Sequence, residues 1–144
     1  MGTCLKVTPW PSVPEYPLLR EAGLLLVYVR RSGPKGSRLV RLALDTGATT
    51  TMIPPKASLA IGVNPARSTT FRQTLTASGQ ELVPLVVIPQ LRLFERTLRR
   101  VTLACHDPSE SPIDGLLGLD LLTRLRVTID LTKPSLCIPS AHSG

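Results

Sequence analysis

One acidic residue stands where a carboxylate could take part in a reaction. Asp45 directly follows the apolar run 42–44 and directly precedes Thr46 and Gly47. A carboxylate at the end of an apolar strand is costly to remove from water, so its position calls for an explanation. The structural explanation is an Asx turn, in which Asp45 accepts hydrogen bonds from the backbone amides of Gly47 and Ala48. A bare Asp-Thr-Gly is common by chance and favours that turn.

Two further segments, in a fixed order, favour a catalytic interpretation. Residues 42–50 read Leu-Ala-Leu-Asp-Thr-Gly-Ala-Thr-Thr, and residues 113–122 read Ile-Asp-Gly-Leu-Leu-Gly-Leu-Asp-Leu-Leu. Between them, residues 75–80 read Leu-Thr-Ala-Ser-Gly-Gln, which is typical of a hairpin with a glycine at its turn. Together these segments resemble the active-site signature, second motif and flap of the retropepsin-like aspartic proteases. The resemblance covers about residues 22–138.

The resemblance implies a role for each residue of the active-site loop. Asp45 resembles the catalytic aspartate. Thr46 resembles the threonine whose hydroxyl bonds to the loop of a partner subunit, and Gly47 the glycine that lets that loop approach. Ala48 follows them in the same loop.

The second motif and the flap take their roles from the same resemblance. Gly118 would let an apolar segment pass beneath the active-site loop, and Leu116 and Leu117 would pack around it. The flap residues would be Thr76, Ala77, Ser78 and Gly79, with Gly79 at the tip.

The mechanism of this family needs two aspartates, and this chain has one Asp-Thr-Gly. Two carboxylates about 3 Å apart cannot both ionise, so they share one proton. The ionised carboxylate takes a proton from a water, and the other polarises the scissile carbonyl. The second aspartate must therefore come from a second copy of the chain. The resemblance thus implies an aspartic endopeptidase that acts on polypeptides as a homodimer, with no cofactor and no metal.

The second motif departs from the retroviral pattern. Retroviral members often carry an aspartate four residues after the catalytic one, paired with an arginine after the glycine of the second motif. Here Thr49 stands at the first place, and Leu119 and Asp120 follow Gly118. Residues 120–122 instead match the Gly-x-Asp-x-Leu form of many bacterial and retroelement members. The ion-pair network is therefore expected to be absent or rewired.

The rest of the chain predicts an all-β domain with one or two short helices. Two pairs of apolar or alternating runs predict hairpins, one over 24–30 and 39–44 and one over 69–77 and 80–88. Further strands are predicted over 98–105, 126–130 and 135–138. Short helices are predicted over 56–61, between two prolines and a glycine, and over 121–125.

The chain divides into an arm, one domain and a short tail. Residues 1–21 form a proline-rich arm, because the four prolines between residues 9 and 17 exclude a helix. Trp10, Tyr16 and Leu18 are expected to anchor this arm by packing on the domain. Residues 22–139 are the predicted protease domain, and residues 140–144 are the tail.

The charge balance gives little support for nucleic acid or membrane partners. The net charge is +7, which permits acidic partners, but the cations are spread thinly and suit a solvated surface. Aromatic residues make up 3% of the chain, too few for a base-stacking platform. The longest apolar run, residues 24–29, is too short to cross a bilayer. We therefore expect a cytoplasmic protein that binds neither nucleic acid nor a membrane.

The cysteines and histidines do not form a metal-binding pattern. Cys4, Cys105 and Cys137 lack close spacing, and His106 and His142 do not complete a zinc site. We expect three reduced thiols.

Two other functions stay open at this point. The chain could be a catalytically silent dimerisation or peptide-binding module on the same fold. Its charge could also suit a β domain associated with nucleic acid, which a salt-dependent binding assay would reveal.

Overall fold

The computed structural model describes residues 13–76, 79–107 and 113–140. The strands are β1 (Glu15–Pro17), β2 (Leu19–Glu21), β3 (Leu24–Gly33), β4 (Gly36–Leu44), β5 (Met52–Ile53), β6 (Phe71–Thr76), β7 (Gly79–Leu93), β8 (Arg96–Cys105), β9 (Leu116–Leu117), β10 (Thr128–Asp130) and β11 (Ser135–Cys137). The helices are α1 (Pro55–Ala60), the 3-10 helix η2 (Pro65–Arg67) and α2 (Leu119–Arg124). The predicted all-β fold with short helices is confirmed.

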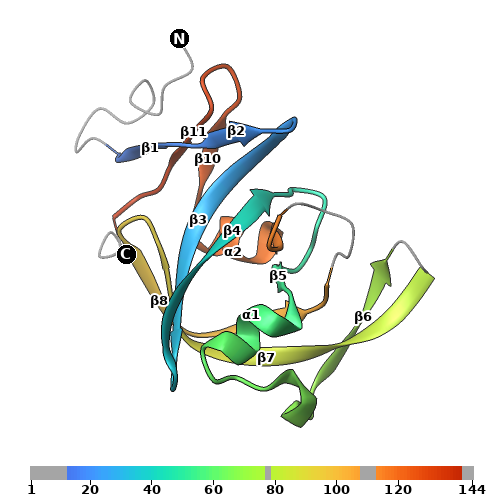
Figure 1. Ribbon diagram of the computed structural model, residues 1–144. Helices are drawn as coiled ribbons and strands as arrows, with labels where there is room; N and C mark the ends of the chain where they lie inside the picture. The colour runs from blue at the N-terminus through green and yellow to red at the C-terminus, as the bar shows by residue number, and fades with distance from the viewer. Residues whose placement is uncertain (1–12, 77–78, 108–112, 141–144) are drawn as a thin grey trace.

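The strands form two sheets. The larger has the order β2-β3-β4-β9-β5-β8-β7-β6, and the smaller the order β1-β11-β10. Strand β3 pairs with β7 as well as with β4, so the larger sheet folds back on itself. Figure 1 shows β3 and β4 running through the body of the molecule while the β6–β7 hairpin projects to one side.

Both predicted hairpins form, and β7 is longer than the sequence suggested. Strand β7 continues to Leu93, whereas its run of alternating residues was expected to end at Ile88. Pro89 falls opposite Arg100, whose φ is 53°, and regular pairing resumes at Gln90. A proline is tolerated in a strand where the ladder is already irregular, which is why Pro89 does not end β7.

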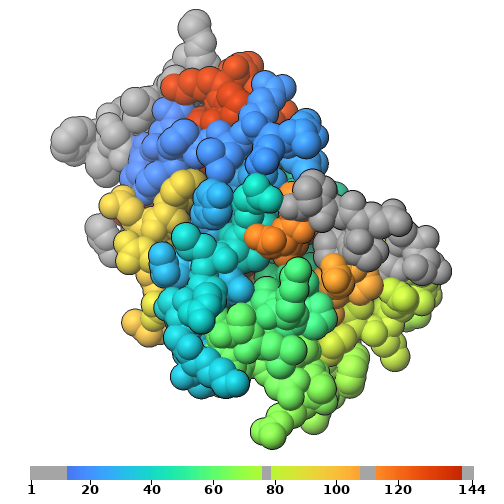
Figure 2. Space-filling model, in the orientation of Figure 1, coloured from blue at the N-terminus to red at the C-terminus, as the bar shows by residue number. Residues whose placement is uncertain are grey.

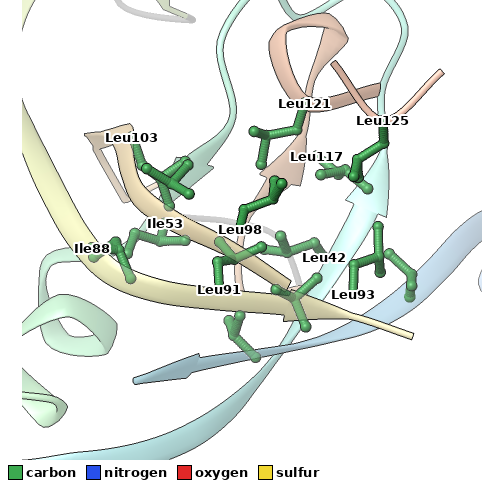
Figure 3. Packing of buried hydrophobic residues seen from close by; sticks show 14 of the residues in the cluster. Leu42, Ile53, Ile88, Leu91, Leu93, Leu98, Leu103, Leu117, Leu121 and Leu125 are labelled. Carbon is green, nitrogen blue, oxygen red and sulfur yellow. The ribbon is translucent and has the colours of Figure 1, made fainter. Parts of the chain in front are cut away.

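The core lies between the folded sheet and α2. Figure 3 shows leucines and isoleucines from β4, β7, β8, β9 and the α2 region pointing toward one another. Leu42, Leu103, Leu117 and Leu125 are fully buried. Burying one such side chain contributes about 1.5–3 kcal/mol. The core thus ties the strand before Asp45 to the second motif and its helix.

The described part of the N-terminal arm packs as expected. The Tyr16 ring stacks on Phe94 with 4.3 Å between centroids, and its hydroxyl donates to Glu95 at 2.9 Å. Leu18 is buried. Residues 15–21 pair with strands of both sheets, so the boundary at residue 21 stays a prediction, and Trp10 lies outside the described residues.

The expectation of three reduced thiols is wrong. Cys137 is disulfide-bonded, whereas Cys105 is free and buried. The spacing argument missed this bond because covalent pairing depends on distance in space. Disulfides are rare in the cytosol, so the bond does not favour the expected cytoplasmic location. Among the described residues, no helix is long and apolar enough to cross a bilayer, and no side-chain cluster suits a metal.

Candidate active site

Asp45 lies at the point where β4 leaves the sheet. Its backbone amide donates to the Leu117 carbonyl at 3.0 Å, which continues the parallel pairing of β4 with β9. The register places Leu44 beside Leu117, immediately before the carboxylate. The second motif therefore fixes the backbone up to Asp45, whose side chain remains partly exposed.

The loop that follows forms the expected turn in part. The Gly47 amide donates to Oδ1 of Asp45 at 2.9 Å, while the Ala48 amide donates to the Asp45 carbonyl at 3.1 Å. A Cβ on Gly47 would lie 3.2 Å from the same Oδ1. The turn orients the carboxylate through one oxygen. Among the described residues, Oδ2 accepts no hydrogen bond, so turn formation and chemistry at Asp45 are compatible.

Gly118 passes very close to the active-site loop. The Leu119 amide donates to the Ala48 carbonyl at 2.8 Å. A Cβ on Gly118 would lie 2.8 Å from the same oxygen and 3.0 Å from the Thr50 carbonyl oxygen. Both neighbours are backbone, so no side chain other than hydrogen fits at Gly118.

A partly buried hydrogen-bond network joins the two motifs. The carboxylate of Asp120 accepts from the Thr51 hydroxyl at 2.7 Å, from the Thr51 amide at 3.0 Å and from the Leu121 amide at 2.8 Å. The Thr51 hydroxyl in turn accepts from the Gly118 amide at 2.9 Å. A hydroxyl–carboxylate contact thus joins the segment after the active-site loop to the second motif without an ion pair. The sequence pointed to Asp120 as part of the motif but gave no signal for its partner.

The predicted flap is an antiparallel hairpin. In β6 and β7, Thr76 pairs with Gly79, whose φ is +112°, while residues 77–78 lie outside the described chain. Val83 is buried against Met52 and Ala104, which packs one face of the hairpin against β5 and β8. In the space-filling view the hairpin stands at one side of the molecule (Figure 2).

A family model described as aspartyl protease matches residues 33–121, well over half of the chain. The chain belongs to the aspartyl protease family. The matched residues include both the Asp-Thr-Gly loop and the second, glycine-containing segment. Among curated protein sequences, none matches this member at a significant level.

Solved structures share the fold of this aspartyl protease family member. A retropepsin-like aspartic protease from Rickettsia conorii superposes with a TM-score of 0.68 and 19% identity, over 88% of this chain and 92% of that one. The retroviral protease-like domain of Ddi1 from Leishmania major gives a TM-score of 0.50 and 17% identity, over 79% and 92%. These likenesses establish the retropepsin-like fold.

Arg72 is a site residue that sequence reasoning missed. It lies on β6, and its guanidinium donates to the Thr50 hydroxyl on the active-site loop. Glu81 lies on the same face of the hairpin, with Oε2 3.9 Å from Nε2 of His106. The face of the flap that meets the active-site loop is therefore partly charged. No local pattern marked Arg72, because its partner lies in a different segment.

Asp114 and Gly115 also have functions that the sequence did not reveal. Oδ2 of Asp114 accepts from the Arg41 amide at 2.8 Å, and the Asp114 amide donates back to the Arg41 carbonyl. A Cβ on Gly115 would lie 2.2 Å from the Met52 carbonyl oxygen. This second Asp-Gly pair anchors the second motif beside β4.

Proposed function

We propose that this chain is an aspartic endopeptidase whose active site is assembled from Asp45 of two identical chains. The observation that carries the proposal is the Asp45 carboxylate itself, oriented through Oδ1 by the Gly47 amide and partly open to solvent. A general acid or base must be held in place and still reach its substrate. Both conditions are met at Asp45.

The second carboxylate would come from a twofold-related chain. One chain supplies a single Asp-Thr-Gly, and Asp114 is held by the Arg41 backbone. Thr46 is exposed, and its hydroxyl has no hydrogen-bond partner among the described residues. This free hydroxyl suits the role of bonding to a partner subunit, with Gly47 and Ala48 shaping the loop that meets it.

The reaction would follow from the shared proton. The ionised Asp45 removes a proton from a water held between the two carboxylates, and that water attacks the peptide carbonyl. The protonated partner donates a hydrogen bond to the carbonyl oxygen as negative charge develops there. The flap residues Thr76 to Gly79 would cover an extended polypeptide bound between the flap and the two carboxylates. Leu116, Leu117 and Gly118 would support the active-site loop from below.

Cleavage of a denatured protein at mildly acidic pH tests the proposal. Asp45→Asn is expected to abolish cleavage while the dimer persists, because asparagine cannot exchange the proton. Asp114→Asn is the matched control, since its amide oxygen can still accept from the Arg41 amide. Activity that survives in purified Asp45→Asn would overturn the proposal. If folded wild type and folded Asp114→Asn both fail to cleave the substrate, the chain is a silent binding module.

A further inference from the structure

Arginines gather on the outward face of the larger sheet. Arg41 on β4, Arg30 on β3, Arg92 on β7 and Arg99 on β8 come from four strands that pair in the order β4-β3-β7-β8. The residues that alternate with them point the other way, into the core: Val29, Val40, Leu91 and Leu93 are buried. We call these four arginines the arginine face.

Two of these arginines are direct neighbours. Arg30 and Arg92 are opposite each other in the antiparallel pairing of β3 with β7. Like charges directly opposite each other on one sheet face are destabilising. A sequence that places arginine at both positions therefore gives up stability there unless an anion lies between the two guanidinium groups.

No carboxylate of the described chain neutralises this pair. The acidic groups nearby are occupied: Glu21 pairs with Arg41 at 2.9 Å, and Glu95 accepts from the Tyr16 hydroxyl. Arg92 donates through Nε to the Phe94 carbonyl, which fixes the side chain but leaves its charge unpaired. Among the described residues, Arg30 forms no ion pair and no hydrogen bond.

An apolar hollow adjoins the pair. A cavity of about 270 Å³ is lined by Arg30 and Arg92 together with Pro17, Tyr28, Leu39 and Phe94. Tyr28 and Leu39 are half exposed, at 50% and 51%. The cavity thus offers two guanidinium groups beside a pocket of the size of one large side chain.

We propose that the arginine face binds an acidic segment of a protein partner, with carboxylates on Arg30 and Arg92 and an apolar side chain in the cavity. The planar guanidinium fork matches a carboxylate bidentately. Nucleic acid fits less well, because Tyr16 already covers one face of the Phe94 ring, which leaves Tyr28 as the one unstacked aromatic side chain among the residues that line the cavity. The site lies on the outward face of the sheet and does not depend on Asp45, so it goes beyond the proposed function.

Peptide binding tests this proposal directly. The probe is a fluorescein-labelled peptide of alternating glutamate and leucine, and its control has glutamine in place of glutamate. Anisotropy is measured with the full chain carrying Asp45→Asn, so that the probe is not cleaved. We expect saturable binding that weakens as salt is added, and at least about tenfold weaker binding of the glutamine peptide.

A pair of variants locates the binding site. Arg30→Gln with Arg92→Gln is expected to weaken binding at least about tenfold. Arg67→Gln with Arg124→Gln removes the same charge from exposed arginines of η2 and α2 and is expected to change binding less than about twofold. Arg30→Gln alone is expected to raise the Tm, because it relieves the repulsion between the two arginines.

Several results would overturn the proposal. Equal losses of peptide affinity in the two double variants would mean that binding depends on net charge alone. Tighter binding of oligothymidine or of phosphatidylserine vesicles than of the glutamate peptide, at one salt concentration, would assign the face to nucleic acid or to a membrane. Absence of peptide binding at low salt, or a lower Tm for Arg30→Gln, would equally contradict it.

Discussion

The hydroxyl of Thr51 donates a hydrogen bond to the carboxylate of Asp120 at 2.7 Å, although 69 residues separate them along the chain. Thr51 is fully buried, and its hydroxyl oxygen also accepts from the Gly118 amide. One side chain therefore satisfies a donor and an acceptor of the second motif at once. The contact holds the two halves of the site together without an arginine.

Thr51→Val is expected to destabilise the protein by about 1–3 kcal/mol, because it leaves the Gly118 amide buried without an acceptor. Valine keeps the shape of threonine, so packing changes little. Urea denaturation followed by circular dichroism gives the free energy of unfolding. Thr51→Ser keeps the hydroxyl, and its free energy of unfolding should fall clearly less than that of Thr51→Val. Equal losses in both variants would show that the methyl group, and not the network, stabilises the site.

Gly118→Ala is expected to cost about 1–3 kcal/mol and most of the activity, because its Cβ would clash with two backbone carbonyls. The φ of Gly118 is −97°, so strain in φ plays no part. Gly23→Ala is the opposite case, with a φ of +78° and nothing within 4 Å of the added Cβ. It should lose about 1 kcal/mol and keep its activity. A Gly118→Ala protein as stable and active as wild type would contradict the close approach.

Arg72→Leu is expected to raise KM about three- to tenfold, because the flap is no longer tied to the active-site loop, and to lower the Tm in step with the lost bond. The variant removes the bond from the flap to the Thr50 hydroxyl, and a bond to a charged group contributes about 1.5–3 kcal/mol at most. Steady-state kinetics on a peptide substrate measures the effect. Gln73→Leu changes the adjacent, outward residue of the same strand and serves as control. A matching rise in KM for Gln73→Leu would mean that hairpin stability, and not the Arg72 contact, is responsible.

The Cys105 thiol is expected to make the free energy of unfolding fall as the pH becomes alkaline. Burial raises the pKa of the Cys105 thiol, and a hydrogen bond with Ser58 opposes this rise in part. A raised pKa means that the folded protein holds the proton more tightly than the unfolded chain. The stabilisation is therefore present below about pH 8.5, the unfolded thiol value, and is lost as the pH rises through the folded value.

The matching experiment compares wild type with Cys105→Ala by urea denaturation across neutral to alkaline pH. The free energy of unfolding of wild type should fall more steeply above about pH 8.5 than that of the variant. All other side chains are the same in both proteins, so the difference between the two curves isolates the thiol. Parallel curves would show that Cys105 does not titrate differently in the folded state.

Local patterns in the sequence predicted the elements well, because strand and turn signals depend on neighbouring residues. The hairpin 24–44 and helix α1 are near their predicted bounds, and the flap hairpin differs mainly in the longer β7. The inner strands β5 and β9 were missed, since two-residue strands carry no periodicity and form only through pairing with distant segments.

Contacts between distant segments explain most of what sequence reasoning missed at the site. The Arg72–Thr50 and Thr51–Asp120 contacts join different segments, and no spacing rule brings them together. Arg31 is a related case: the cations are expected on a solvated surface, yet Arg31 is buried and donates through Nε to the Ala57 carbonyl. Arg31 lies two residues after the buried Val29 on β3. Side chains two residues apart on a strand point to the same face, so Arg31 points inward. Burial lowers the pKa of Arg31, while the charge of Asp114 opposes the change.

A mixing experiment tests whether two copies of Asp45 are needed at once. If each site takes one carboxylate from each chain, a dimer of wild type with Asp45→Asn is inactive. With a ninefold excess of the variant and full exchange, only about one tenth of the wild-type chains pair with each other. Activity per wild-type chain should therefore fall to about one tenth. Asp114→Asn in the same excess is the control and should leave the activity unchanged. Undiminished activity in the Asp45→Asn mixture would show that one chain contains a complete site.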